Sequence, residues 1–164
     1  MAGTGAAVRN ERVAMLKTST DASGNDVYSL MGTGFESLDD ALNPEVDEVT
    51  YISDTSATKT VTSYAPEFAF DATVIKDDAV ITFLRGIGKA LSTGAAAESK
   101  IVTYDVWDVS GNVVDAVQFN VAVAMDSIGS GAGGEKLGMS GTILAKGDAI
   151  PGSYDTSTDV FTAT

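Results

Sequence analysis

The chain has 164 residues, and its hydrophobic fraction of 44% is enough for one domain with a sizeable core. It contains neither cysteine nor histidine, which excludes disulfides, thiolate chemistry and the commonest metal ligand and general base. With 23 acidic and 10 basic residues the net charge is −13, which repels phosphate backbones and argues against specific nucleic-acid binding. Charged residues within positions 1–16 argue against a signal peptide, and no apolar run is long enough to span a bilayer, so we expect folding in a cytosol.

The N-terminal segment is predicted to contain a flexible arm followed by a hairpin. Residues 1–7 are small and include two glycines, so they should be flexible until something binds them. Val8 to Lys17 is typical of a strand. The turn cluster from Asp21 to Asp26 leads into a second predicted strand, Val27 to Met31, which indicates a hairpin with the first.

The next stretch, residues 34–66, is acidic and nearly aperiodic. Seven carboxylates precede its first basic residue, Lys59, and only Val49 to Ile52 is predicted to form a short strand. The Asn43-Pro44 pair favours an extended or turn backbone. A connection this long inside a compact domain is typical of disorder or of a binding loop, and its apolar side chains argue against disorder. We therefore predict that residues 36–60 form a long arm that is buried on a neighbouring molecule.

A long strand and a helix are predicted after the arm. From Val61 to Ile75 the alternation places Tyr64, Phe68, Phe70 and Val74 on one face, and Pro66 predicts an edge position, a bulge or a break into two strands. Asp77-Asp78 then opens a helix that continues to about Leu91, since Val80, Leu84, Ile87 and Leu91 recur at helical spacing. Gly94 is the predicted stop. Gly86 and Gly88 within the helix each cost about 1 kcal/mol relative to alanine, which close approach to a sheet would explain.

The C-terminal half is predicted to be strands. Lys100 to Val109 and Asn112 to Asp126 form a hairpin joined at Ser110-Gly111. One face of the second strand is apolar, and the other is small and polar and contains Gln118, Asn120, Ala122, Ala124 and Asp126. A glycine-rich link at 129–134, a strand at 136–146, a turn at 147–152 and a polar C-terminal arm at 153–164 complete the chain. The predicted fold is mainly β (α+β), a single domain over residues 1–164 in which two packed antiparallel sheets form a sandwich or barrel beside one helix.

No motif in the chain supports catalysis. Gly129, Gly131 and Gly134 have the spacing of a dinucleotide-binding loop, but no helix is predicted to follow them. The acidic pairs Asp39-Asp40, Asp77-Asp78 and Asp105/Asp108 could be imagined as catalytic acids or cation ligands, but a solvated arm, a helix N-terminus and a strand surface explain them. We predict a protein that is not an enzyme, with no catalytic residues, no metal and no cofactor, and with a structural role.

The order of these elements and several short sequence motifs resemble those of one protein family. An N-terminal hairpin is followed by an acidic arm with Gly34-Phe35-Glu36, Leu38-Asp39, Asn43-Pro44 and Tyr51-Ile52, and then by Tyr64-Ala65-Pro66, the Asp77-Asp78 helix, the Val102 to Trp107 strand and a closing glycine-rich strand. Over roughly residues 25–152 this combination resembles the major tail proteins, or tail tube proteins, of long-tailed bacteriophages. In that family a β-sandwich packs against a helix, six subunits close a ring, and stacked rings form the tube through which the genome passes.

The resemblance implies a virion structural protein, made in the host bacterial cytoplasm, that assembles with itself and with tip, terminator and tape-measure proteins. DNA would pass through the tube without specific binding, and no membrane would be involved. The arm would contact an adjacent subunit or ring, with Leu38, Leu42, Asn43, Pro44, Val49, Tyr51 and Ile52 as candidate contacts. The polar strand faces would line the lumen, with Glu67, Asp71, Gln118, Asn120 and Asp126 as candidate lining residues.

Two other functions remain open at this point. The first is the inner tube of a phage-derived injection particle or secretion system. The second is a monomeric β-sandwich module for carbohydrate binding or adhesion, in which Tyr104 and Trp107 would form the sugar-binding face, although aromatic residues in an apolar strand more often belong to a core or an interface.

Overall fold

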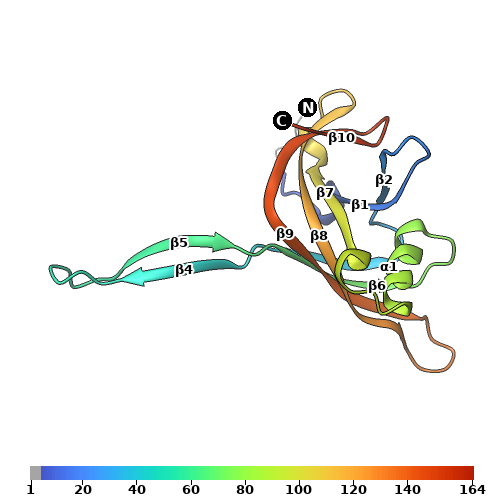
Figure 1. Cartoon of the computed structure of the whole chain (residues 1–164), viewed down its shortest axis with the longest axis horizontal. Coiled ribbons are helices and arrows are strands. Elements are labelled where there is room, and N and C mark those ends of the chain that lie inside the picture. Colours follow the sequence, from blue (N-terminus) through green and yellow to red (C-terminus); the bar gives the residue numbers. More distant parts are fainter. Residues whose placement is uncertain (1–4) are drawn as a thin grey trace.

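A computed structural model describes residues 5–164 of the chain, which are mainly β with one α-helix (Figure 1). A large antiparallel sheet has the strand order β2-β1-β7-β8-β9-β6-β3, with β10 paired to β9. Two further strands, β4 and β5, form a separate two-stranded antiparallel sheet that projects from the body. The strands of the large sheet are β1 (Arg12–Thr20), β2 (Asp26–Leu30), β3 (Phe35–Ala41), β6 (Glu67–Thr73), β7 (Glu98–Asp105), β8 (Val113–Ser130), β9 (Gly138–Asp155) and β10 (Val160–Ala163).

The large sheet buries apolar side chains on both of its faces, in two separate clusters. The main core lies between the sheet and α1 (Ala79–Lys89) and receives side chains from β1, β3, β6, β7, β8 and β9. A second cluster lies on the opposite face, where β1, β2, β7, β8 and the C-terminal end of β9 surround the fully buried Tyr154. Adjacent residues of β1 and β7 therefore serve different cores: Leu16 and Ile101 belong to the first, and Met15 and Val102 to the second.

The helix is positioned by its ends and by one glycine. Asp78 caps its N-terminus, since the carboxylate accepts hydrogen bonds from the backbone N–H groups of Val80 (3.1 Å) and Ile81 (3.0 Å). At the C-terminus Leu91 adopts φ = 50°, and Ser92 donates back to the Ile87 carbonyl, so the helix ends in a Schellman motif before Gly94. Gly88 lies directly against Ile128 of β8, which confirms close approach to a sheet, whereas Gly86 faces open space.

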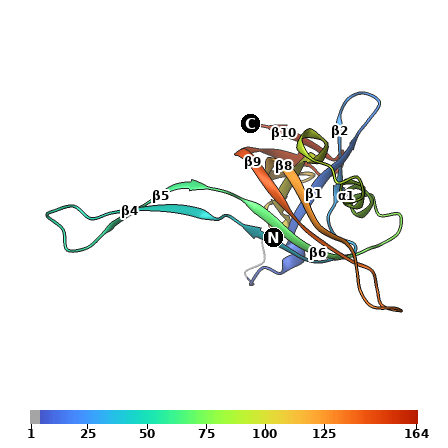
Figure 2. The same ribbon diagram turned by 60° about the horizontal axis from the view of Figure 1, so that its bottom comes forward.

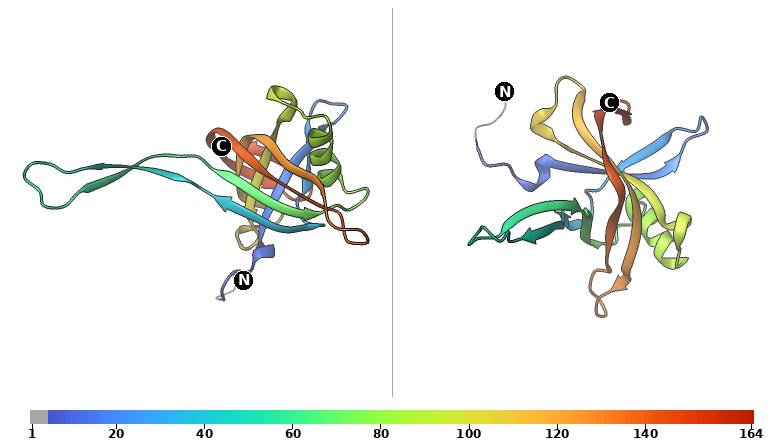
Figure 3. Two further views of the ribbon diagram at one scale, coloured as in Figure 1. Left: turned by 90° about the horizontal axis from the view of Figure 1, so that it is seen from below. Right: turned by 60° about the vertical axis from the view of Figure 1, so that its left-hand side comes forward.

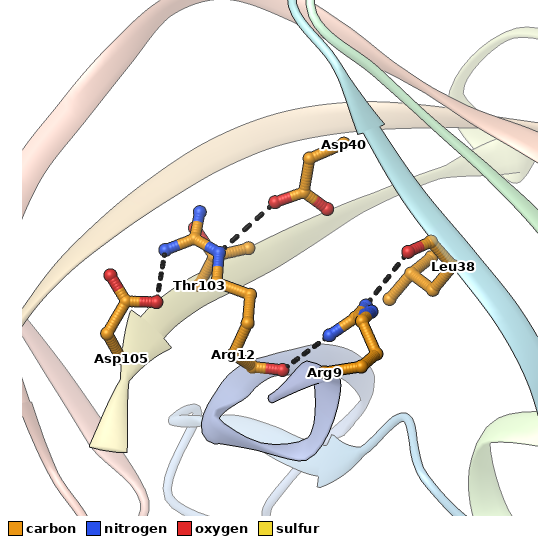
Figure 4. Close-up of polar contacts among 6 residues, drawn as sticks. All are labelled: Arg9, Arg12, Leu38, Asp40, Thr103 and Asp105. Atoms are coloured by element: carbon orange, nitrogen blue, oxygen red, sulfur yellow. Dashed lines mark hydrogen bonds and ion pairs between the residues drawn. The ribbon is translucent and has the colours of Figure 1, made fainter. Parts of the chain in front are cut away.

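The start of β1 and the edge strand β3 lie near each other without pairing, and two arginines, Arg9 and Arg12, bridge them (Figure 4). Arg12 contacts Asp40 of β3 and Asp105 of β7, both at 3.2 Å. Arg9, in the 3-10 turn Arg9–Glu11 that precedes β1, donates to the Leu38 carbonyl at 2.9 Å. Because side chains rather than backbone hydrogen bonds join these strands, the sheet curls strongly without closing into a barrel.

The fold class, mainly β with two antiparallel sheets and one helix, is confirmed, as are the β1–β2 hairpin and the break at Pro66 between β5 (Thr58–Tyr64) and β6. Several boundaries differ from the predictions. The first strand begins at Arg12 rather than Val8, and Leu91 is exposed beyond the helix instead of lying on its apolar face. The predicted turn at 147–152 lies within β9, where a register shift opposite β8 bends the strand.

Both ends of the chain were predicted to be arms. Of the predicted flexible arm at 1–7, residues 1–4 lie outside the described residues. The predicted C-terminal arm at 153–164 is part of the large sheet, because it contains the end of β9 and the whole of β10. Tyr154, expected only as an anchor, is fully buried and stacks on Tyr104 with ring centroids 5.4 Å apart.

Candidate assembly surfaces

A two-stranded hairpin of β4 (Pro44–Val49) and β5 projects away from the body and touches none of the large sheet beyond its root (Figures 1 and 2). Every residue of both strands is exposed. The root is closed by hydrogen bonds from the Ala65 N–H to the Leu42 carbonyl (3.1 Å) and from the Asn43 side-chain amide to the Ala65 carbonyl (3.2 Å). The segment predicted to be an aperiodic arm is therefore an ordered hairpin, and residues 35–41 before it form β3.

The hairpin presents apolar side chains that stay largely exposed within the described part of the chain. Val46 faces Val61 across the two strands, and both are 50% exposed. Beyond the end of β4, Tyr51 is 58% exposed and Ile52 fully exposed. An isolated two-stranded hairpin is at best marginally stable in water, and this much unburied apolar surface is typical of an interaction surface.

The charge of the hairpin is negative. Glu45, Asp47, Glu48 and Asp54 stand against a single base, Lys59, which pairs with Glu48 at 3.3 Å. Charged and apolar side chains are mixed along β4 without regular alternation, so no period of two was visible in the sequence. A surface that binds the hairpin must therefore cover its apolar side chains and must either neutralise its carboxylates or leave them in water.

The structure separates the seven candidate contact residues of the predicted arm. Leu38 is only 7% exposed and belongs to the main core, so the expectation that it reaches a neighbouring subunit is wrong for this residue. Leu42, Asn43 and Pro44 lie at the root of the hairpin. Val49 ends β4, and Tyr51 and Ile52 lie in the connection between β4 and β5 near the outer end. Val46, Val61 and Tyr64, absent from that candidate set, are exposed in the same hairpin.

A second surface is the face of the large sheet that lies opposite α1, over strands β3, β6, β9 and the C-terminal half of β8. Residues directly paired across antiparallel strands share a face, and the pairs Ser37–Asp71, Asp71–Ser140 and Glu67–Leu144 continue across these strands. The opposite face carries the buried Phe68, Phe70 and Ile143. We call this surface the open face; it comprises Ser37, Asp39, Ala41, Glu67, Ala69, Asp71, Asn120, Ala122, Ala124, Ser140, Thr142 and Leu144.

The open face is formed by small and polar side chains with three carboxylates, those of Asp39, Glu67 and Asp71. Its cations are Lys146 and Lys100, which pair directly with Asn120 from either side. They form ion pairs with Glu98 and Asp26, respectively. Three of the five predicted lumen residues, Glu67, Asp71 and Asn120, lie on it. Such a face is accessible to water but offers few cationic groups to hold an anion.

Two of the predicted lumen residues do not fit that face. Gln118 is 8% exposed, and its amide donates a 2.6 Å hydrogen bond to the Tyr28 hydroxyl beside the second cluster. The curled end of the sheet covers this part of β8, which alternation alone did not reveal. Asp126 is exposed but lies at a register shift between Met125 and Ser127, so its direction does not follow from the pairing.

The second cluster perturbs several titrating groups. Burial, together with the charge of Asp26, raises the pKa of Tyr28 to about 12. Burial and its hydrogen bond to Asp159 raise the pKa of Tyr154 as well. Burial alone would raise the pKa of Asp26, but Lys100 and Lys17, each 2.7 Å away, outweigh it and lower that pKa. Both tyrosines are therefore held neutral within a core at neutral pH.

The other sites considered from the sequence are structural in the described residues. Asp40 and Asp105 hold Arg12, Asp78 caps the helix, and Gly131 and Gly134 lie in the β8–β9 connection. Over residues 5–164 no group of three or more acidic side chains is arranged to hold a metal ion. No described helix is both long and apolar enough to cross a membrane.

Comparisons with known proteins identify the architecture. No protein-family model matches the chain, and no curated protein matches it closely enough to count. Among solved structures, a chain from the tail of an empty gene transfer agent particle, determined with C6 symmetry, superposes with a TM-score of 0.60 at 12% identity, over 96% of this chain and 100% of that one. A chain from the sheath/tube terminator of the PVC extracellular contractile injection system gives 0.54 at 11% identity, over 91% and 99% of the two chains.

A chain from the baseplate of the anti-feeding prophage gives a TM-score of 0.52 at 11% identity, over 94% of this chain and 99% of that one. All three matches extend over nearly the whole of both chains, so the likeness includes the sheet, the helix and their order. The chain has the fold of the tail proteins of gene transfer agents and contractile injection systems, which is the fold implied by its resemblance to phage tail tube proteins.

Proposed function

We propose that this chain is the subunit of a phage tail tube. Copies of it would close hexameric rings, and the rings would stack into the conduit for genome delivery. The single observation that carries the proposal is the exposed hairpin β4–β5, an ordered element with unburied apolar side chains on a body that has the fold of tail proteins. The C6 symmetry of the similar gene transfer agent tail supports six subunits per ring.

The open face supplies the channel wall in this proposal. DNA must slide through the tube without sticking, and a wall with carboxylates and small polar groups repels phosphates and makes few attractive contacts. Glu67, Asp71 and Asn120 would face the lumen. Tip, terminator and tape-measure proteins would be the other partners, the chain would reside in the virion tail, and it would be made in the cytoplasm of the host bacterium.

A second candidate is the inner tube of a phage-derived injection particle, favoured by the likeness to chains of two contractile injection systems. Electron microscopy of the parent particle separates the two, because only one of them carries a genome-filled head. The carbohydrate-binding alternative loses support, since Tyr104 stacks on the buried Tyr154 and is not available as a sugar platform beside Trp107.

The proposal is tested by the concentration dependence of assembly. Sedimentation velocity of the purified protein should show growth into large species as concentration rises, and negative-stain images of those species should show hollow tubes of uniform diameter. A variant with the hairpin removed serves as the matched control and should stay monomeric. A wild-type protein that stays monomeric at every accessible concentration would refute the proposal.

A further inference from the structure

A groove of about 370 Å³ lies between β1, the end of β2 and β3, at the seam that Arg9 and Arg12 bridge (Figure 4). Its walls include the apolar side chains of Val13, Leu30 and Phe35, and Leu30 is 53% exposed. The strand β3 offers a free edge there, because among residues 5–164 β6 is the only strand that pairs with it. The groove thus combines exposed apolar surface with an unpaired strand edge, both of which favour association.

Arg9 supplies a cation to this groove, which Glu36 also lines, with its carboxylate accepting a hydrogen bond from the Thr73 hydroxyl. Its guanidinium is held in place by two backbone carbonyls, those of Arg12 (2.7 Å) and Leu38 (2.9 Å). Within residues 5–164 no carboxylate lies at ion-pairing distance from it, whereas Arg12 already contacts two. A guanidinium fixed in this way still has N–H groups with which to bind a carboxylate. In a chain of net charge −13, a groove with such a cation is a rare place where an acidic segment can dock.

The hairpin has the complementary properties. Tyr51 and Ile52 form an exposed apolar end, and the carboxylates of Asp47 and Asp54 lie on either side of them in the sequence with no ion-pair partner among the described residues. Strand geometry places this end roughly 25 Å from the root. The ribbon views show it far from the body of its own chain (Figure 3), so it must meet a different copy.

We propose that the groove between β1 and β3 receives the outer end of the β4–β5 hairpin from a second copy of the chain, with Tyr51 and Ile52 against the apolar walls and a hairpin carboxylate on Arg9. This inference rests on the proposed tube function and specifies the receiving surface within it. Arg9 and Arg12 also hold Leu38 and Asp40 of β3, the strand that leads into the hairpin. A hairpin docked in the groove would therefore contact the residues that fix the base of the receiving copy's own hairpin.

The absence of cysteine from the chain permits a direct test by disulfide trapping. Ile52→Cys combined with Asn10→Cys, an exposed position in the groove, should give a ladder of covalent multimers when assembled protein is oxidised. The matched control combines Ile52→Cys with Thr82→Cys, which is exposed on α1, and should give no ladder. Tubes that form normally but yield no ladder with Asn10→Cys would overturn the groove assignment and leave the tube function standing.

A charge exchange tests the same contact without cysteine. Arg9→Glu should raise the protein concentration needed for assembly, and adding Asp54→Lys should lower it again. A double variant that assembles no better than Arg9→Glu alone would overturn the pairing of Arg9 with this end of the hairpin. A ladder without any tube in electron micrographs would support the groove contact and refute the tube function. The absence of both ladder and tubes would refute both proposals.

Discussion

The two helix glycines provide a matched pair of substitutions with opposite expected effects. A Cβ at position 88 would lie 2.3 Å from Cγ2 of Ile128 and 3.5 Å from Cβ of Met125, whereas a Cβ at position 86 would meet nothing within 4 Å. The Ile128 methyl group is attached to a branched β-carbon with little rotamer freedom, so it cannot simply move aside. The helix or the end of β8 must shift to accept alanine at 88.

Replacing glycine by alanine inside a helix gains about 1 kcal/mol, and overpacking of a filled site costs about 1 to 3 kcal/mol. Gly86→Ala should therefore raise the free energy of unfolding by about 1 kcal/mol, which corresponds to a rise in Tm of about 2–4 °C for a chain of this size. Gly88→Ala should leave that free energy unchanged or lower it by up to about 2 kcal/mol.

Urea unfolding followed by circular dichroism, at concentrations too low for assembly, measures both variants under the same conditions. The two midpoints should lie on opposite sides of the wild type or, at the least, differ by about 1 kcal/mol or more in free energy. Equal stabilisation by the two alanines would mean that the helix does not lie against β8 at Gly88, and the packing described for the main core would be wrong.

Three other predictions follow from the hairpin, the open face and the second cluster. Replacing residues 44–64 by a short Gly/Ser linker should leave a folded, β-rich monomer, because Asn43 and Ala65 already lie together and loop length changes closure entropy little; loss of the folded circular dichroism spectrum would show that the hairpin belongs to the core. Glu67→Lys with Asp71→Lys should permit assembly but slow DNA ejection, most strongly at low salt where screening is weakest; wild-type ejection rates at low salt would mean that these residues do not line the channel. Burial raises the pKa of Tyr28 in the folded protein to about 12, from an ordinary value of 10. The stability that this shift contributes is fully present below pH 10 and is lost as the pH rises through 12. Thermal melts should show Tm falling over this range, and the fall should be smaller for Tyr28→Phe.

The elements that the sequence predicted well are those whose signals are local. Asp78 and the apolar spacing that follows it predicted the helix, and Pro66 predicted the break between β5 and β6, because proline has no N–H to donate to a neighbouring strand. The apolar side chains of β6 alternate because one of its faces is covered along its whole length and the other is open. The alternation in the sequence of β6 therefore predicted its buried face correctly.

The elements that the sequence did not predict depend on contacts between distant residues. Arg12 joins Asp40 and Asp105, which are 28 and 93 residues away, so no local pattern indicates the seam between β1 and β3. Gln118 was taken for a lumen residue because it alternates with Phe119, yet the curled sheet buries Gln118 on one face of β8 while Phe119 is partly buried on the other. The hairpin β4–β5 showed no alternation because its own chain buries neither of its faces, so charged and apolar residues are mixed along β4.

In the proposed assembly, copies of this chain build a hollow tube lined by the open face. A helical reconstruction by electron cryomicroscopy of assembled protein tests it most directly. The expected map has six subunits in each ring, a continuous channel with Glu67 and Asp71 on its wall, and each hairpin extending onto another subunit. A solid fibre, or a tube in which the open face is buried between subunits, would contradict the claim.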